Sequence, residues 1–374
     1  MTHLEQLPIP PAAKKLLPLI DWQMVLWMLA IKALVFGFAA VSVRTLLNEE
    51  ISWWEMWNRW DALHYRLLAQ FGYSATGEER FSLVFFPLYP WLVRFGAIIW
   101  RDYFAAAVAI SGIASIAAGL LLQKLTRLDH SIAISRQAVW FLFIFPTSYF
   151  LHIGYTESLF LALVIGSLLA ARKDRWALAG LLGAGACLTR VNGLILLPVL
   201  AVEAWQRYRE TRRINWSWLW IGAAGLGFAI YLWLNYHVTG DFFMFSKIMA
   251  EHWHKEFTPP WIGIRDLWLR FPDPDFTESF HELFYVVLGL LCTVWCWVKL
   301  RPSYATWMTC NWLLINSTSF VLSVPRYTLT FFPIFILFAR LAVKQPRVGA
   351  LVTVWSLLSL GLFVSKFVQG TWAF

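Results

Sequence analysis

The chain has 374 residues, of which 59% are hydrophobic and only 14% are charged, and its mean hydropathy is +0.58. An ordinary soluble domain has roughly a quarter of its residues charged, so this composition excludes one and predicts an all-α polytopic membrane protein. The net charge of +9 is explained by Lys and Arg in cytoplasmic loops, where these residues are enriched, so no nucleic acid partner is expected. We expect one transmembrane domain over residues 1–374.

The first apolar segment, residues 22–43, is long enough to span the bilayer. Lys14 and Lys15 precede it and place the N-terminus in the cytoplasm, because positive charge is retained on that side. Residues 44–101 are then expected to form the first outer loop.

Residues 52–72 of this loop are predicted to form one helix of about five turns. Ser52 and Glu55 have the spacing of a capping box, and Gly72 stands where a helix would end. The segment carries too many charges to cross hydrocarbon. We therefore expect it to lie at the membrane interface and to present a carboxylate to a site.

Residues 85–100 are ambiguous, because they are apolar but short and contain two prolines and Arg94. If they cross the bilayer, the next two cationic clusters face outward, and if they form a re-entrant or interfacial helix, both clusters face the cytoplasm. The clusters are Lys124, Arg127 and Arg136, and Arg172, Lys173 and Arg175. The preference of Lys and Arg for cytoplasmic loops favours the re-entrant or interfacial helix.

The remaining chain alternates apolar segments with short polar turns. The further spans are expected at residues 102–123, 137–153, 158–171, 176–188, 193–205, 218–237, 281–298, 304–322, 328–343 and 351–367, which makes about eleven in all. The two spans that flank residues 189–193 have only about a dozen residues each, which is too short for a full crossing and predicts a cavity beside them. Residues 239–280 are expected to form a long outer loop and 323–327 a short one.

Four polar clusters are predicted to meet at the outer face. They are Arg59, Asp61 and His64; Tyr155, Thr156 and Glu157; Thr189, Arg190 and Asn192; and Arg326 with Tyr327. Ionisable groups near a membrane are costly, so they are usually paired and often functional. A carboxylate here could take a proton from an attacking hydroxyl, and Arg could hold the oxygens of a lipid-borne phosphate.

Each cluster also has a purely structural interpretation. Asp61 could pair with Arg59 or Arg66 on its own helix, and Glu157 could cap the next helix or pair with Arg190. Separately, His252 and His254 have a spacing that can bind metal, but no third ligand is nearby in the sequence. No cofactor is therefore predicted, and a metal ion is left open.

At these residues the sequence resembles a known family. The blocks that carry the resemblance are, in order, RWDALHY, FGY, FFPLYPWLVR, SYFLHIGYTESLF, LTRVNG and PRYTLTFFPIF. They are similar to the signature blocks of the PIG-V family, the GPI mannosyltransferase II group with its bacterial and archaeal relatives, which belongs to the GT-C superfamily of membrane glycosyltransferases. The resemblance implies a GT-C fold, interfacial helices in the first outer loop, and inverting transfer of mannose from a polyprenyl-phosphate mannose donor.

The resemblance also implies roles for two acidic residues. Asp61 matches the catalytic acid of the family's WD motif, and Glu157 matches the acidic residue of its second outer loop. The chain has little outer-loop material compared with eukaryotic members, which favours a prokaryotic relative that acts on a lipid or glycan other than a GPI precursor.

We therefore predict an integral membrane mannosyltransferase whose active site faces the extracytoplasmic side. Asp61 would accept the acceptor's proton. Arg190 and Arg326, with His64 or Arg59, would bind the leaving phosphate, while Tyr65, Tyr155, Glu157 and Asn192 would orient sugar hydroxyls and Tyr327 would contact substrate. The alternatives are a transporter or flippase of a lipid-linked sugar, in which the same charges line a path, and a non-catalytic subunit of a glycosylation complex.

Overall fold

The computed structural model describes residues 20–46, 52, 55–270 and 278–374, and all statements below refer to these residues. The described chain is helical and has no β-strand, apart from one isolated antiparallel bridge between Phe257 and Thr318. Lys14, Lys15 and positions 53–54 of the predicted helix lie outside the described residues, and so do the predicted loop positions 47–51 and 271–277.

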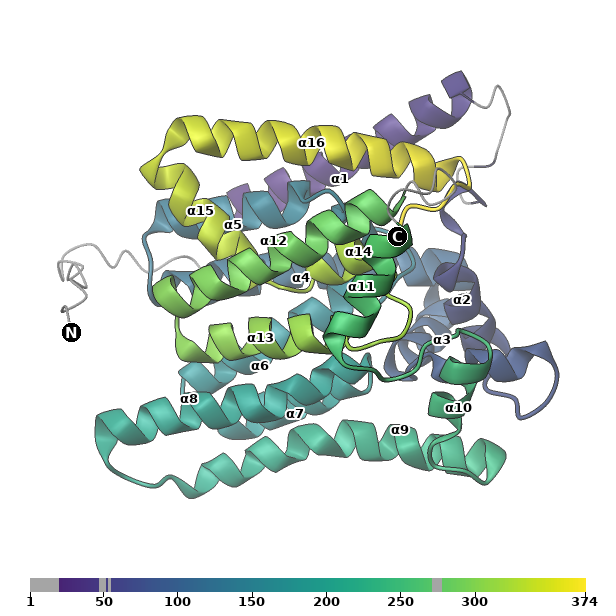
Figure 1. Cartoon of the computed structure of the whole chain (residues 1–374), viewed down its shortest axis with the longest axis horizontal. Coiled ribbons are helices and arrows are strands. Elements are labelled where there is room, and N and C mark those ends of the chain that lie inside the picture. Colours follow the sequence, from purple (N-terminus) through teal and green to yellow (C-terminus); the bar gives the residue numbers. More distant parts are fainter. Residues whose placement is uncertain (1–19, 47–51, 53–54, 271–277) are drawn as a thin grey trace.

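Each of the eleven segments predicted to span the membrane overlaps one main helix of a bundle (Figure 1). These helices are α1 (Trp22–Leu46), α4 (Tyr103–Arg127), α5 (Ile132–Ile144), α6 (Glu157–Arg172), α7 (Trp176–Cys187), α8 (Leu196–Thr211), α9 (Ala223–Thr239), α12 (Glu278–Lys299), α13 (Pro302–Asn316), α15 (Pro333–Lys344) and α16 (Pro346–Val368). Short 3-10 segments add Glu55–Trp57, Glu78–Val84, Ser148–Leu151, Val191–Ile195 and Trp216–Gly222. The all-α prediction is confirmed.

Five helical segments of the described chain are long and apolar enough to cross a membrane: Trp22–Leu46, Tyr103–Arg127, Trp216–Thr239, Glu278–Lys299 and Pro346–Val368. The others of the bundle have 12 to 16 residues. Among them α15 is apolar and buried from Pro333 to Ala339, so this part of α15 lies in the core of the bundle. The structure is that of an integral membrane protein, while the number of eleven crossings stays a prediction.

The remaining helices gather at one end of the bundle. They are α2 (Asp61–Phe71), α3 (Leu88–Trp100), α10 (Met244–Glu251), α11 (Pro260–Arg270) and the five-residue α14 (Val324–Thr328). Figure 1 shows α2, α3, α10 and α11 in the right-hand part of the bundle. The prediction that 323–327 is only a loop was wrong, because α14 forms one helical turn there.

The prediction of a single helix over 52–72 was also wrong. Ser52 Oγ does accept a hydrogen bond from the Glu55 amide at 3.3 Å, but the first helical piece ends at Trp57 and α2 begins at Asp61. Trp60 interrupts the helix with a φ of 48°. Its ring packs edge-on against two aromatic residues at the end of the chain, Phe367 and Trp372. These tertiary contacts override the local helical preference, whereas the predicted end at Gly72, with a φ of 86°, is confirmed.

The ambiguous segment 85–100 forms α3, which joins the 3-10 turn Glu78–Val84 at an angle of 111°. Such a bend occurs in a broken span or in a re-entrant segment, and if the pair is one span the number of candidate spans rises to six. Both interpretations drawn from the sequence therefore stay open.

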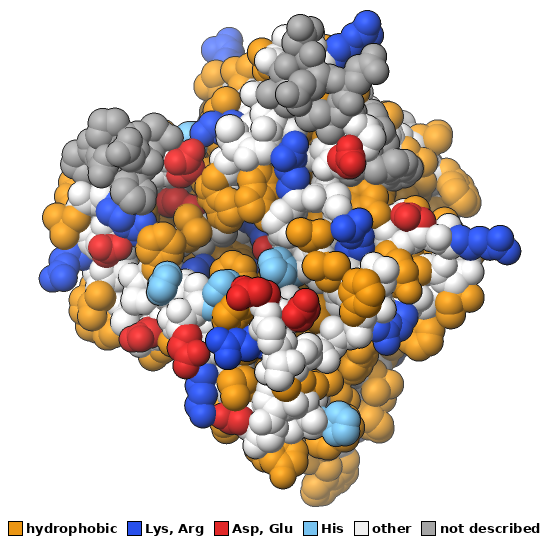
Figure 2. All heavy atoms as spheres, turned by 90° about the vertical axis from the view of Figure 1, so that its right-hand side faces the viewer, with side chains coloured by type: hydrophobic (Ala, Val, Ile, Leu, Met, Phe, Trp, Pro, Cys, Tyr) orange, Lys and Arg blue, Asp and Glu red, His pale blue; other side chains and the backbone are white. Residues whose placement is uncertain are grey.

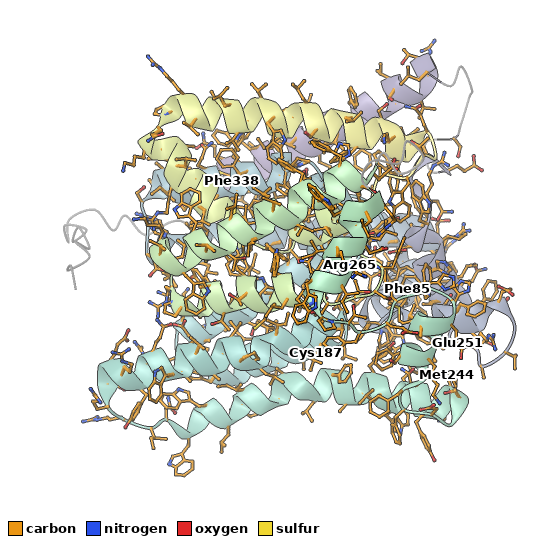
Figure 3. The ribbon with its side chains drawn as sticks, viewed as in Figure 1. Phe85, Cys187, Met244, Glu251, Arg265 and Phe338 are labelled. Carbon is orange, nitrogen blue, oxygen red and sulfur yellow. The ribbon has the colours of Figure 1, made fainter. Side chains whose placement is uncertain are left out.

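The short helix predicted before residue 189 is confirmed, since α7 has 12 residues and ends at Cys187. Figures 1 and 3 show that it stops well short of the far end of the neighbouring α9. The chain then folds back on itself: a Cβ added at Gly193 would lie 2.4 Å from the backbone nitrogen of Cys187. The following helix, α8, has 16 residues and is longer than predicted.

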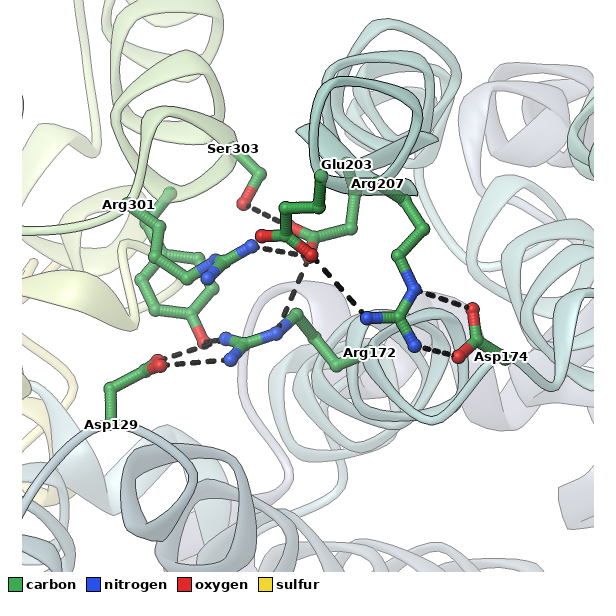
Figure 4. Close-up of polar contacts among 9 residues, drawn as sticks. Asp129, Arg172, Asp174, Glu203, Arg207, Arg301 and Ser303 are labelled. Atoms are coloured by element: carbon green, nitrogen blue, oxygen red, sulfur yellow. Dashed lines mark hydrogen bonds and ion pairs between the residues drawn. The ribbon is translucent and has the colours of Figure 1, made fainter. Parts of the chain in front are cut away.

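The cationic turns meet where α6 ends, at Arg172, and Figure 4 shows the contacts among their side chains. Arg172 binds Asp129 at 2.8 Å and Glu203 at 3.3 Å, and Glu203 also accepts from Arg301 at 2.8 Å. Arg207 pairs with Asp174 in the same region. The C-terminal half of α8 and the chain around the ends of α4, α6 and α12 therefore lie together, and the cationic residues there are grouped as the charge pattern predicts.

Candidate active site

Four charged side chains from distant parts of the chain meet at the end that carries α2, α3 and α10. The Arg326 guanidinium donates to Asp61 Oδ2 at 2.6 Å through one terminal nitrogen and to Glu157 Oε1 at 2.5 Å through Nε. Arg190 donates to the same Glu157 oxygen at 2.6 Å. The result is one network of two carboxylates and two guanidinium groups.

Local structure places each member of the network. Asp61 and Glu157 are the first residues of α2 and α6, where the positive end of the helix dipole favours a carboxylate. Arg190 follows the end of α7, and Arg326 lies in α14. Ionic pairing of buried groups offsets the cost of removing their charges from water.

The two carboxylates differ in accessibility. The Glu157 side chain is 0% exposed, and its Oε2 has no hydrogen-bond partner within the described part of the chain. The Asp61 side chain is 24% exposed. Asp61 is therefore the carboxylate that an incoming group could reach directly.

Aromatic rings line the guanidinium groups. The Arg326 guanidinium lies 4.6 Å from the ring centroid of Tyr155 and 4.9 Å from that of Phe150. The Arg190 guanidinium lies 5.3 Å from the centroid of Tyr327. Such rings stabilise a cation and exclude water around it, so the two guanidinium groups are held in fixed positions.

Two predicted tyrosines support the site. Tyr155 donates to the backbone carbonyl of Arg59 at 2.9 Å, next to the Trp60 break. The Tyr65 hydroxyl lies 3.5 Å from Thr156 Oγ1, which also accepts from Arg190 at 3.0 Å. Both tyrosines are buried, and both lie against residues of the charged network or residues bound to it.

Two other predicted site residues, Arg59 and Asn192, bind different partners. The Arg59 guanidinium donates to the carbonyls of Met56 and Val368, at 3.2 and 2.9 Å. Asn192 donates to Asn311 Oδ1 on α13 at 2.8 Å. Neither contacts the charged network through these bonds.

His64 lies beside the network on α2. It shares a hydrogen bond of 3.0 Å with Ser82 Oγ and stacks on Phe85 at 4.8 Å. Burial lowers the pKa of His64 below its usual 6.5, with the nearby Asp61 charge opposing this and His252 adding to it. The imidazole is therefore mainly neutral near pH 7.

Asp61 does not form the pair with Arg59 or Arg66 that a purely structural interpretation allowed, since its partner is Arg326. Glu157 does pair with Arg190, as that interpretation allowed, and it also binds Arg326.

A segment of the predicted long outer loop reaches the site, although its sequence gives no sign of this contact. Lys255 Nζ lies 5.9 Å from the ring centroid of Tyr327, and Trp253 lies edge-on to His64 at 6.1 Å. Backbone pairing holds the segment, because the Ser319 amide donates to the Glu256 carbonyl at 2.9 Å. No local motif marks this contact, which depends on residues far apart in the chain.

Within the described residues, His252 and His254 are not part of a group that could hold a metal ion. His252 stacks on Phe81 with ring centroids 3.8 Å apart. Over the described ranges, no three His, Cys, Asp or Glu side chains are grouped so that they could hold a metal ion. Figure 2 shows acidic, basic and His side chains spread over this end of the molecule.

Comparison with known proteins was made at the levels of sequence and fold. No family model matches the sequence. A stretch of 138 residues, 36% of the chain, is 30% identical to GPI mannosyltransferase 2 of Yarrowia lipolytica and covers 37% of that protein. The match thus spans little more than a third of the length of this curated relative.

Two solved structures are similar over most of the chain. ArnT from Cupriavidus metallidurans, bound to undecaprenyl phosphate, has a TM-score of 0.50 and 15% identity, covering 94% of this chain and 72% of ArnT. The apo oligosaccharyltransferase of Archaeoglobus fulgidus has a TM-score of 0.43 and 13% identity, covering 95% of this chain and 57% of that chain.

The likeness to ArnT defines the class: this is an all-helical membrane protein with the GT-C glycosyltransferase fold. The partial match to GPI mannosyltransferase 2 agrees with the resemblance to the PIG-V family that the sequence blocks carry.

Proposed function

We propose that the protein is an inverting membrane glycosyltransferase that moves mannose from polyprenyl-phosphate mannose to a hydroxyl of a lipid-linked or glycan acceptor outside the cytoplasm. The observation that carries the proposal is the single guanidinium of Arg326, which bridges Asp61 and Glu157 at the end of the bundle that carries α2 and α3. The name of the partly matching mannosyltransferase supports the choice of sugar. The ArnT structure, which holds undecaprenyl phosphate, supports a polyprenyl carrier.

Asp61 is the proposed general base because it is the more exposed carboxylate. The acceptor O–H gives its proton to Asp61 as the acceptor oxygen forms a bond to the anomeric carbon. The bond from that carbon to the phosphate oxygen breaks at the same time, and the polyprenyl phosphate leaves with the electron pair. Attack opposite the leaving group inverts the configuration.

The cationic side chains would stabilise the charge that develops on the leaving phosphate. Arg190 and Arg326 are already fixed by Glu157 and by aromatic rings. Lys255 is a further candidate, because it reaches the same Tyr327 ring and forms no ion pair within the described residues. An ammonium of this kind is free to bind an anionic group.

Glu157 has a different proposed role. One of its oxygens holds both guanidinium groups, whereas Oε2 is buried and has no partner in the described chain. An unpaired buried acceptor is costly. A hydroxyl of the transferred sugar would satisfy it, so Glu157 would orient the sugar and hold the arginines.

The direct test uses purified protein in vesicles, with polyprenyl-phosphate mannose labelled in the sugar and a membrane extract as the source of acceptor. The proposal predicts that label moves to a new product while free polyprenyl phosphate is released. If the intact labelled donor instead crosses the vesicle membrane without cleavage, the protein is a flippase. If no label moves and the protein only binds a catalytic partner, the subunit interpretation holds.

A further inference from the structure

One buried carboxylate outside the network holds the turn that carries Arg326. Glu282 lies in the first turns of α12 and is 1% exposed. Its Oε1 accepts from the backbone amide of Ser323 at 2.7 Å, and its Oε2 accepts from the amide of Val324 at 2.7 Å. Both oxygens therefore bind adjacent N–H groups at the start of α14.

This turn needs such an anchor. A five-residue helix has too few internal hydrogen bonds to be stable alone. Ser323 also has a φ of 70°, a left-handed conformation that persists in a residue other than Gly only where the surroundings fix it. Glu282 supplies that restraint at Ser323 itself.

A second contact holds the turn from another side. The buried Thr147 hydroxyl donates to the carbonyl of Pro325 at 3.0 Å. Glu282 and Thr147 thus hold the three residues that immediately precede Arg326, and they come from different helical regions. The backbone of Arg326 is fixed before its side chain reaches Asp61 and Glu157.

We propose that Glu282 is a positioning residue for the reaction: it aims the Arg326 guanidinium at the two site carboxylates through a bidentate anchor on the preceding amides. This inference rests on the proposed function. Stability alone gives little reason for a buried carboxylate here, because Glu282 forms no ion pair within the described residues and feels Lys255 and Arg270 only from beyond contact distance, so the loss of its hydration is poorly offset. Two acceptors at the spacing of adjacent N–H groups are what a carboxylate offers and an amide does not.

The test is Glu282→Gln, which keeps the size of the side chain but turns one acceptor into a donor that faces an amide. We expect kcat to fall by roughly 10- to 100-fold with little change in KM for the donor. The matched control is Glu278→Gln, one turn earlier on α12, whose carboxylate pairs with Lys366. The control should keep wild-type kcat.

A double-mutant cycle separates positioning from a general structural effect. In an Arg326→Lys background, Glu282→Gln should cause little further loss of kcat, because the guanidinium that Glu282 positions is absent. An equal loss in both backgrounds, or wild-type activity of Glu282→Gln, would overturn the inference. Thr147→Val, which disturbs the same turn from another side, should show the same coupling and serves if Glu282→Gln does not fold.

Hydrogen exchange makes the test independent of activity. Glu282→Gln should speed exchange at the amides of Ser323 and Val324 but not in α2, whether or not the protein transfers mannose. If wild-type protein transfers no sugar, the proposed function fails, and the positioning role fails with it. If exchange at these two amides is unchanged, Glu282 does not anchor the turn, and the inference fails even if the enzyme is active.

Discussion

At the scale of single residues, the site depends on the planar fork of one arginine. Arg326 reaches Asp61 through one nitrogen and Glu157 through another. Lysine carries the same charge but concentrates it at one point, so it cannot hold both carboxylates in this geometry. The geometry of the fork, and not its charge alone, therefore fixes the relative positions of the two acids.

Replacing Arg326 with Lys should lower kcat by roughly 100-fold or more. The negative charge that develops on the leaving phosphate would lose a hydrogen-bond donor in a fixed position, and Asp61 and Glu157 would no longer be bridged. Arg265→Lys is the matched control, since Arg265 is an exposed residue of α11 at the same end of the molecule (Figure 3). Steady-state kinetics of the two variants with the labelled donor gives the comparison. Equal activity of both variants would contradict the role given to the fork.

At the scale of elements, irregular backbone positions two of the charged site residues. The helix break at Trp60 puts Asp61 at a helix start, and the early end of α7 brings Arg190 to the network. The short α7 could be predicted from its length in the sequence. The break at Trp60 could not, because it depends on Phe367 and Trp372, which are distant in the chain.

Gly193 is the position where this irregular backbone is most sensitive. A Cβ there would lie 2.4 Å from Cys187 N and 2.5 Å from the carbonyl carbon of Ala186, and backbone atoms cannot rotate away. Gly193→Ala should therefore shift the Arg190 turn and lower activity by at least roughly tenfold.

The control is Gly222→Ala, because a Cβ at Gly222 meets nothing within 4 Å. Transfer assays and thermal unfolding of both variants check the prediction. A Gly193→Ala protein with normal stability and normal activity would show that the turn need not pack on α7.

At the scale of the whole molecule, the positions of charged residues in this apolar sequence predicted more of the site than the spacing of residues along helices did. Asp61, Glu157, Arg190 and Arg326 could be grouped from the sequence because charges near hydrocarbon are costly unless they meet partners. Lys255 and Glu282 could not be added to that group. Each reaches the site through contacts between segments far apart in the sequence, and neither lies in a recognisable motif.

The same charge argument predicts sidedness. The turn after α4 should face the cytoplasm and the site end should face outward, because the turns rich in Arg and Lys meet at the end away from the site. In intact cells, His130→Cys should resist an impermeant thiol reagent, whereas Arg265→Cys should react with it. Labelling of His130→Cys from outside would show that the predicted topology is wrong.

The central claim is that Asp61 removes the acceptor's proton, and Asp61→Asn tests it most directly because the side chain keeps its size and loses its basicity. Asp266→Asn is the control, since Asp266 pairs with Arg270 on α11. We predict that Asp61→Asn inserts and folds normally, still binds polyprenyl phosphate, and loses mannose transfer by roughly 100-fold or more, while Asp266→Asn transfers mannose at the wild-type rate. Wild-type transfer by Asp61→Asn would contradict the mechanism.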